Sequence, residues 1–194
     1  MESGHITLDS LYQHVNHDPC FQSIDGQGKT GREYAALATK LTSNIPIQQG
    51  FYIWGNYEEN SLWRTIYLGK ASSGKTSSLK ARILEELKDE RIFMWADSQP
   101  NLNNAELMRL ALNQYPRKGL DKHFSRALRK KGTTHIIWVS TPDILKDEIL
   151  NIEADLIETM NPFANSMRPS PSSGLLDITI EVIKRFKSEI HGLR

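Results

Sequence analysis

The sequence predicts an α/β (α+β) domain in which a small mixed β-sheet of about three strands is flanked by helices. Two aromatic and branched runs, at residues 50–54 and 63–68, are typical of paired strands, and an apolar run at residues 135–140 is typical of a buried strand. Amphipathic segments with helical spacing lie before, between and after these runs. The 194 residues are enough for one well-packed core.

The amino-acid composition excludes several classes of protein. The 39% hydrophobic and 24% charged residues are ordinary for a globular domain, and the net charge of +1 neither favours nor excludes nucleic acid. Cys20 is the only cysteine, so disulfides within the chain and cysteine-rich zinc sites are excluded. The N-terminus lacks the pattern of a secretory signal, and no apolar stretch approaches the roughly 20 residues that span a bilayer. We therefore expect a cytoplasmic location and no membrane partner.

The N-terminal part, residues 1–47, is predicted to form a helical extension. Apolar residues recur at near-helical spacing over residues 6–15 and again over residues 30–41, with turn-forming residues between the two segments. The runs at residues 50–54 and 63–68 then predict a β-hairpin with a loop longer than the commonest forms.

The remaining elements follow in order. An amphipathic helix is predicted at residues 77–89, and the strand at residues 135–140 precedes Thr141-Pro142, a helix-start signal for a helix that runs to about Met160. Further helices are expected at about 104–114, 120–131 and 175–190, and a serine- and proline-rich linker at 166–174. We expect a core at 48–166 that carries a basic helical insertion at 97–132, followed by a linker and C-terminal helix at 167–194.

One carboxylate lies on the apolar face of the helix that ends near Met160. Glu153 is four residues from Ile149 and from Ile157, both members of the helix's apolar stripe. Burying a carboxylate costs free energy unless it is paired, hydrogen-bonded or bound to a metal. A glutamate at the edge of the stripe that reaches water is the alternative, so a functional interpretation needs support from elsewhere in the chain.

Scattered motifs supply that support. Gly50-Phe51-Tyr52 and Tyr67-Leu68-Gly69-Lys70-Ala71 lie on predicted strands, Arg82 lies on the next helix, and Glu153 is followed by Leu156, Ile157, Pro162 and Asn165. In this order the fragments resemble the core of the GIY-YIG nuclease family. The resemblance covers roughly residues 48–92 and 134–166.

The resemblance implies hydrolysis of phosphodiester bonds. It assigns Mg²⁺ (or Mn²⁺) binding to Glu153, with water and substrate phosphate as the other ligands. Tyr52 or Tyr67 would position and deprotonate the attacking water, assisted by nearby cations because the unperturbed pKa of tyrosine is about 10. Arg82 and Lys70 would bind the scissile phosphate. Individually, each tyrosine is equally typical of an aromatic residue packed in a sheet.

The resemblance assigns a role to one more residue, and the sequence departs from the family's usual pattern at three points. By resemblance, Asn165 orients the substrate or the helix that carries the glutamate. Phe51 replaces the usual isoleucine, the loop between the tyrosine motifs is long, and Glu86 occupies a position where many members carry a histidine. This last departure bears on the leaving-group side of the reaction.

A second motif overlaps the same segment. The residues from Gly69 to Thr76 fit the phosphate-binding P-loop pattern, in which Lys75 would reach the terminal phosphates of a nucleotide. This alternative predicts an ATPase or kinase, but Asp143, the nearest acid after the apolar run 135–140, opens a predicted helix instead of ending the strand. A domain of the same family that binds nucleic acid without cutting it is the third alternative.

Basic residues concentrate in the insertion, where they predict contact with nucleic acid. With Lys75, the expected nucleic-acid-binding residues are Arg117, Lys118, Lys122, Arg126, Arg129 and Lys130. Such a face would neutralise phosphates and make binding depend strongly on salt, although a solvated helix face has the same pattern.

We expect a DNA endonuclease acting on double-stranded DNA, sequence-specific and of the restriction or defence type. A structure-specific repair nuclease and a mobile-element nuclease are the alternatives within the family. The apolar stripe of the C-terminal helix either packs on the core or pairs two subunits, and cutting both strands with one site per chain would favour a homodimer.

Overall fold

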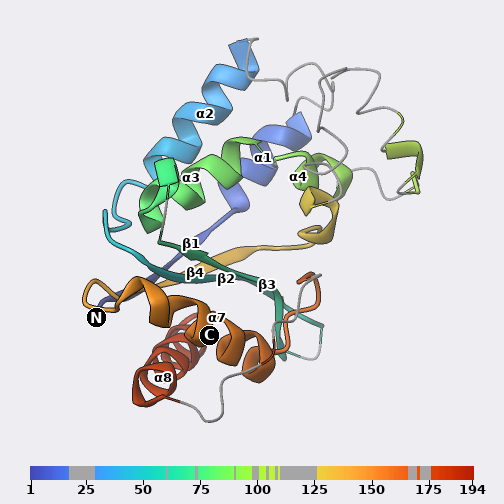
Figure 1. Ribbon diagram of the computed structural model, residues 1–194. Coiled ribbons are helices and arrows are strands. Elements are labelled where there is room, and N and C mark those ends of the chain that lie inside the picture. The colour runs from blue at the N-terminus through green and yellow to red at the C-terminus, as the bar shows by residue number, and fades with distance from the viewer. Residues whose placement is uncertain are drawn as a thin grey trace. The chain divides into compact units, whose positions relative to one another are not determined.

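The fold is a β-sheet flanked by helices, as the α/β (α+β) prediction states, although the described strands are all antiparallel and do not form the mixed sheet that was expected (Figure 1). The computed structural model describes residues 1–17, 29–59, 61–72, 74–89, 91–97, 101–103, 105–107, 109, 126–165, 170 and 176–194. In chain order the elements are β1 (Ser3–Thr7), α1 (Asp9–His17), α2 (Lys29–Leu41), β2 (Gly50–Tyr57), β3 (Trp63–Ala71), the 3₁₀ turn η2 (Gly74–Thr76), α3 (Leu79–Asp89), α4 (Ile92–Asp97), β4 (His135–Ser140), α7 (Lys146–Met160) and α8 (Asp177–Gly192).

The described strands form one four-stranded sheet in the order β1-β4-β2-β3, and every neighbouring pair is antiparallel. The hairpin of β2 and β3 and the strand β4 are the three predicted strands. The fourth, β1, corrects the prediction of a helix beginning near Ile6, because Ser3–Thr7 pairs with β4 and α1 begins only at Asp9. Gly4 permits this pairing, since a Cβ there would lie 2.6 Å from the Trp138 ring.

The α7 helix begins later than the Thr141-Pro142 signal predicts. Its first residue is Lys146, and Glu148 accepts a hydrogen bond from the backbone N–H of Leu145 at 3.3 Å. The side-chain amide of Gln49 donates to the carbonyl oxygens of Thr141 (3.1 Å), Pro142 (3.3 Å) and Ile144 (2.6 Å). These hydrogen bonds satisfy the three carbonyl groups while the chain is in a non-helical turn. The helix therefore begins after this turn. The helix ends at Met160, as predicted.

The chain forms two compact units, which we describe separately. The first contains residues 1–7, 44–82 and 133–194 and therefore all four strands, α7 and α8. The second contains residues 8–43 and 83–132 and joins the N-terminal helices to the segment that precedes β4. The division differs from the predicted boundaries, because α8 belongs to the unit that contains the sheet and is not an appended element.

The core of the first unit lies between one sheet face and the two helices α7 and α8 (Figure 1). Phe51 and Ile53 of β2 alternate with Tyr52 and Trp54, so only the first pair faces this core. Its other members from the two helices are Ile149, Ile152, Leu156, Ile157, Val182, Ile183 and Phe186. The predicted C-terminal stripe therefore packs on the core.

The second unit is held by buried polar contacts as well as by apolar ones. Burial raises the pKa of the Tyr34 hydroxyl, which donates a hydrogen bond to the carbonyl oxygen of Leu87 at 2.8 Å. Lys130 and Glu86 form an ion pair at 2.8 Å, and their side chains are 0% and 1% exposed. A buried charge without its partner is costly, so this pair ties α3 to the segment before β4.

We predict that Lys130→Met lowers the free energy of unfolding by about 3–5 kcal/mol, because it leaves the Glu86 carboxylate buried without a counter-charge. Urea unfolding followed by far-UV circular dichroism measures the change. The double variant Lys130→Met, Glu86→Leu should recover most of the loss. A double variant as unstable as the single one would contradict the assignment of the loss to an uncompensated charge.

Candidate active site

Tyr52 is fixed at the centre of the β2–β3 pair. It pairs with Gly69 across the strands, and its side chain is 0% exposed. A Cβ at Gly69 would lie 2.4 Å from the Tyr52 hydroxyl oxygen and 2.5 Å from the adjacent ring carbon. The glycine of the Tyr67-Leu68-Gly69-Lys70 motif is therefore needed to admit the tyrosine ring.

Arg82 reaches Tyr52 from the first turn of α3. This turn is anchored before β2, because the N–H of Leu79 donates to the carbonyl oxygen of Gln48 at 2.8 Å. The Nε–H of Arg82 donates to the Tyr52 hydroxyl oxygen at 3.4 Å. The rings of Tyr52 and Tyr67 lie side by side, with centroids 6.3 Å apart and planes inclined by 50°. The structure thus brings together three of the predicted site residues.

Lys70 and Glu153 form the other half of the arrangement. Glu153 lies near the middle of α7, and its carboxylate accepts a hydrogen bond from the Lys70 ammonium group. Both side chains are partly buried, 23% exposed for the lysine and 20% for the glutamate. The carboxylate on the apolar helix face is accordingly paired, as partial burial of an anion requires.

A cavity of about 210 Å³ joins the two halves. It is lined by Tyr67, Lys70, Ser72, Thr76, Arg82 and Glu153. Successive strand residues point to opposite faces, so Tyr67 and Lys70 project from opposite faces of β3. They line one cavity because β3 is the last strand of the described sheet. The hydroxyls of Ser72 and Thr76 were missed by the sequence analysis, although both lie within the P-loop-like segment.

Asn165 lies outside this cavity and binds the edge of β3. Its Oδ1 accepts from the N–H of Leu68 and its Nδ2 donates to the carbonyl oxygen of Leu68, both at 2.9 Å. The N–H groups of Phe163 and Ala164 donate to the carbonyl oxygens of Thr65 (3.2 Å) and Ile66 (2.6 Å). The segment 163–165 therefore covers this edge of β3 as a hydrogen-bonded turn. The predicted role in orienting the α7 helix agrees with these contacts better than a role at the substrate.

Only part of the predicted nucleic-acid-binding set can be placed. Arg126 and Arg129 are partly buried in a helical turn. The prediction is wrong for Lys130, because its side chain is fully buried against Glu86. The same contact accounts for Glu86, which by the resemblance stands where many GIY-YIG nucleases carry a histidine and which does not line the cavity. Outside the described residues lie Arg117, Lys118 and Lys122 and, although its backbone is described, the side chain of Lys75.

The P-loop-like segment has a different local explanation. Gly69 belongs to β3, an antiparallel edge strand, and accommodates Tyr52. Gly74 has a φ of +75°, a conformation that favours glycine, at the start of η2. The strand therefore requires the first glycine of the pattern, and the turn requires the second. In addition, the parallel strand that precedes a phosphate-binding P-loop is absent from the described sheet. This geometry disfavours the nucleotide-binding alternative.

The donor set fits a hydrated divalent cation held by one carboxylate. No group of three or more histidine, cysteine, aspartate or glutamate side chains is positioned to hold a metal among the residues that the structure describes. Mg²⁺ commonly keeps several waters and binds through one or two carboxylates plus substrate phosphate. Glu153 at the cavity wall offers that kind of attachment and no dedicated cage.

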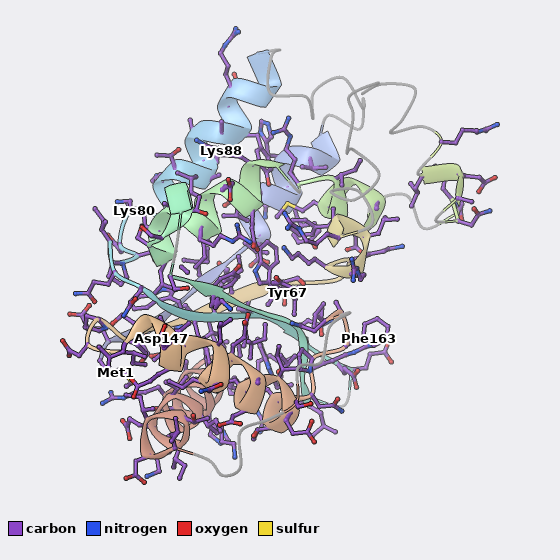
Figure 2. All side chains as sticks on the ribbon, in the orientation of Figure 1. Met1, Tyr67, Lys80, Lys88, Asp147 and Phe163 are labelled. Carbon is purple, nitrogen blue, oxygen red and sulfur yellow. The ribbon has the colours of Figure 1, made fainter. Side chains whose placement is uncertain are left out.

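Comparison with protein-family models, with curated proteins and with solved structures finds no match to this chain. Among the described helices, none combines the length and the apolar character that crossing a bilayer demands. The site must therefore be interpreted from its own geometry. Figure 2 labels Tyr67 of the cavity and Phe163 of the segment that pairs with β3.

We predict that Asn165→Ala lowers the free energy of unfolding by about 1–3 kcal/mol, because the partly buried backbone groups of Leu68 lose both hydrogen bonds. Guanidinium unfolding monitored by tryptophan fluorescence measures it. Asn165→Asp should cost at least as much, because a carboxylate oxygen would face the Leu68 carbonyl oxygen. An aspartate variant as stable as the parent would show that the two amide contacts contribute little.

Proposed function

We propose that this chain is a metal-dependent DNA endonuclease that hydrolyses phosphodiester bonds with a site of the GIY-YIG type. The observation that carries the proposal is the shared cavity of Tyr67, Lys70, Arg82 and Glu153. These residues come from a strand and two helices that lie far apart in the sequence. Unrelated packing would not be expected to bring to one cavity the residues that the family resemblance selects.

Glu153 would hold Mg²⁺ or Mn²⁺, which supplies a Lewis acid for the phosphoryl oxygen. The carboxylate is oriented for this task by Lys70, whose ammonium group binds one of its oxygens. Lys70 also contributes positive charge at the cavity wall, where negative charge develops on the phosphoryl oxygens during attack. Partial burial of both groups strengthens these interactions relative to open water.

The two tyrosines have different surroundings and therefore different proposed roles. Tyr67 lines the cavity, so its side chain, as the phenolate, would orient the attacking water and accept its proton to become the neutral phenol. Tyr52 is 0% exposed and accepts a hydrogen bond from Arg82, so it acts as a positioning residue. The planar guanidinium of Arg82 lines the cavity and is suited to bidentate contact with a phosphodiester.

Double-stranded DNA is the proposed substrate, and a restriction or defence role is the proposed context. Arg109, Arg126, Arg129 and Lys131 are the described members of the basic segment that keep some exposure. Phosphate contacts of this kind hold a duplex without reading its sequence. Repair of branched DNA and mobility of a genetic element remain the alternatives within the same chemistry, and a dimer would supply one site for each strand.

We expect the purified protein to cut plasmid or phage DNA in Mg²⁺ or Mn²⁺ and not in EDTA. Glu153→Gln should lower the cleavage rate on the order of 100-fold or more, because the carboxylate charge that would hold the metal is lost. Gel electrophoresis of timed digests measures the rate. Discrete fragments would indicate sequence specificity, and diffuse nicking would favour a structure-specific or nonspecific nuclease.

Glu158→Gln is the matched control, because Glu158 lies on the same helix and is exposed. It should cut at the parental rate. Equal activity of the parent and the Glu153→Gln variant would refute the proposed site. DNA binding without cleavage under every metal condition would favour the non-cutting module, and tight ATP binding that depends on Lys75 would favour the P-loop.

A further inference from the structure

An exposed aromatic residue lies on the same edge of β3 as the candidate active site. Phe163 is 69% exposed, although its backbone is fixed by the hydrogen bond from its N–H to the carbonyl oxygen of Thr65. The guanidinium carbon of Arg64 lies 4.5 Å from the centroid of its ring. Contact between a large apolar side chain and water is unfavourable. Because the backbone of Phe163 is fixed with the ring in solvent, a ligand that covers the ring would gain free energy.

A second cavity adjoins this pair of residues. Its volume is about 430 Å³. It is lined by Trp63, Arg64, Thr65, Met160, Asn161 and Phe163. The indole N–H of Trp63 donates to the Thr65 hydroxyl at 3.1 Å, which fixes the orientation of its ring. The lining therefore offers flat aromatic and guanidinium surfaces together with a positive charge.

The two cavities lie along one strand. Lys70 lines the first and Arg64 the second, six residues apart on β3. A strand rises about 3.4 Å per residue, so their backbones are about 20 Å apart. Even at the axial rise of a duplex strand, about 3.4 Å per nucleotide, about six nucleotides span this distance, and an extended unpaired strand needs fewer. A single DNA strand can therefore contact both cavities.

We propose that the cavity at Phe163 and Arg64 binds one unpaired nucleobase of the DNA strand whose phosphodiester lies at the Glu153 cavity. This inference rests on the proposed phosphodiester hydrolysis and, within it, favours the alternative of a structure-specific nuclease over restriction of a fully paired duplex. Bases that leave the duplex stack on aromatic rings and on arginine planes, and every base has a face that can do so. Arg64 adds attraction for the neighbouring phosphates. A fully paired duplex hides its base faces, so it would gain nothing from this cavity.

Fluorescence anisotropy in EDTA tests the inference without requiring cleavage. The probes are a fluorescein-labelled blunt duplex and the same duplex with a 3′ or a 5′ extension of about six thymines, which matches the span along β3. We expect the protein to bind one extended duplex more tightly than the blunt one. Phe163→Ala should weaken binding of that duplex on the order of ten-fold and leave the blunt duplex unchanged. Phe163→Trp should retain the preference.

Two exposed residues outside both cavities supply matched controls. Leu150→Ala removes an exposed apolar side chain from α7, and Arg185→Leu removes an exposed arginine from α8. Both should bind every probe as the parent does, whereas Arg64→Leu should lose the preference for the extension. An equal loss on blunt and extended duplexes would overturn the inference, as would no loss with Phe163→Ala or no binding of any probe by the parent.

The same proteins assayed with Mg²⁺ separate this inference from the proposed function. A preference for the extension that depends on Phe163, found in a protein that does not cut, would support the base-binding cavity and count against the nuclease. Cleavage with binding that is independent of Phe163 would support the nuclease and overturn the cavity. Loss of both would refute both.

Discussion

Hydrogen bonding along the outer edge of β3 is the constraint on which the candidate site depends. Segment 163–165 pairs with this edge through two backbone bonds and through the side-chain amide of Asn165, which binds both polar groups of Leu68. Without such partners, the backbone N–H and C=O groups at the edge of a sheet would pair with a strand of another chain or would lack a hydrogen bond. Because the segment follows α7 directly, the same bonds fix the end of the helix that carries Glu153 against the strand that carries Lys70.

The position of β3 at the edge also explains how one cavity collects residues from two sheet faces. Tyr67 and Lys70 project from opposite faces by the alternation of the strand. On a central strand, neighbouring strands on both sides would separate the two side chains. At the edge, Arg82 approaches beside Tyr67 and Glu153 beside Lys70, and all four line the same space. Ser72 and Thr76 complete it because the chain turns directly after the strand.

The local periodicity of the sequence predicted most of the strands and helices. It could not predict features that depend on contacts between distant residues. The hairpin, β4 and the face of α7 follow from patterns a few residues long, whereas the grouping of Lys70 with Glu153 was implied only by the resemblance to the GIY-YIG nuclease core. The strand β1 was predicted as helix because its partner β4 lies more than 120 residues away. The start of α7 depends on the distant amide of Gln49, and the burial of Lys130 depends on Glu86, 44 residues earlier. No local pattern contains these partners.

The Lys70–Glu153 pair constrains how the proposed reaction would begin. Among the described residues that line the cavity, Lys70 and Arg82 are cationic and Glu153 is anionic, so these side chains together carry one net positive charge. A phosphodiester entering the cavity gives Lys70 a second anion to bind. Unit charges 4 Å apart interact by about 4 kcal/mol at an effective dielectric constant of 20, so that attraction is comparable with the pair it replaces. On the proposed mechanism, Lys70 would hold the carboxylate until the substrate phosphate arrives and then leave it at little net cost, so Glu153 would bind a cation only when that phosphate is present.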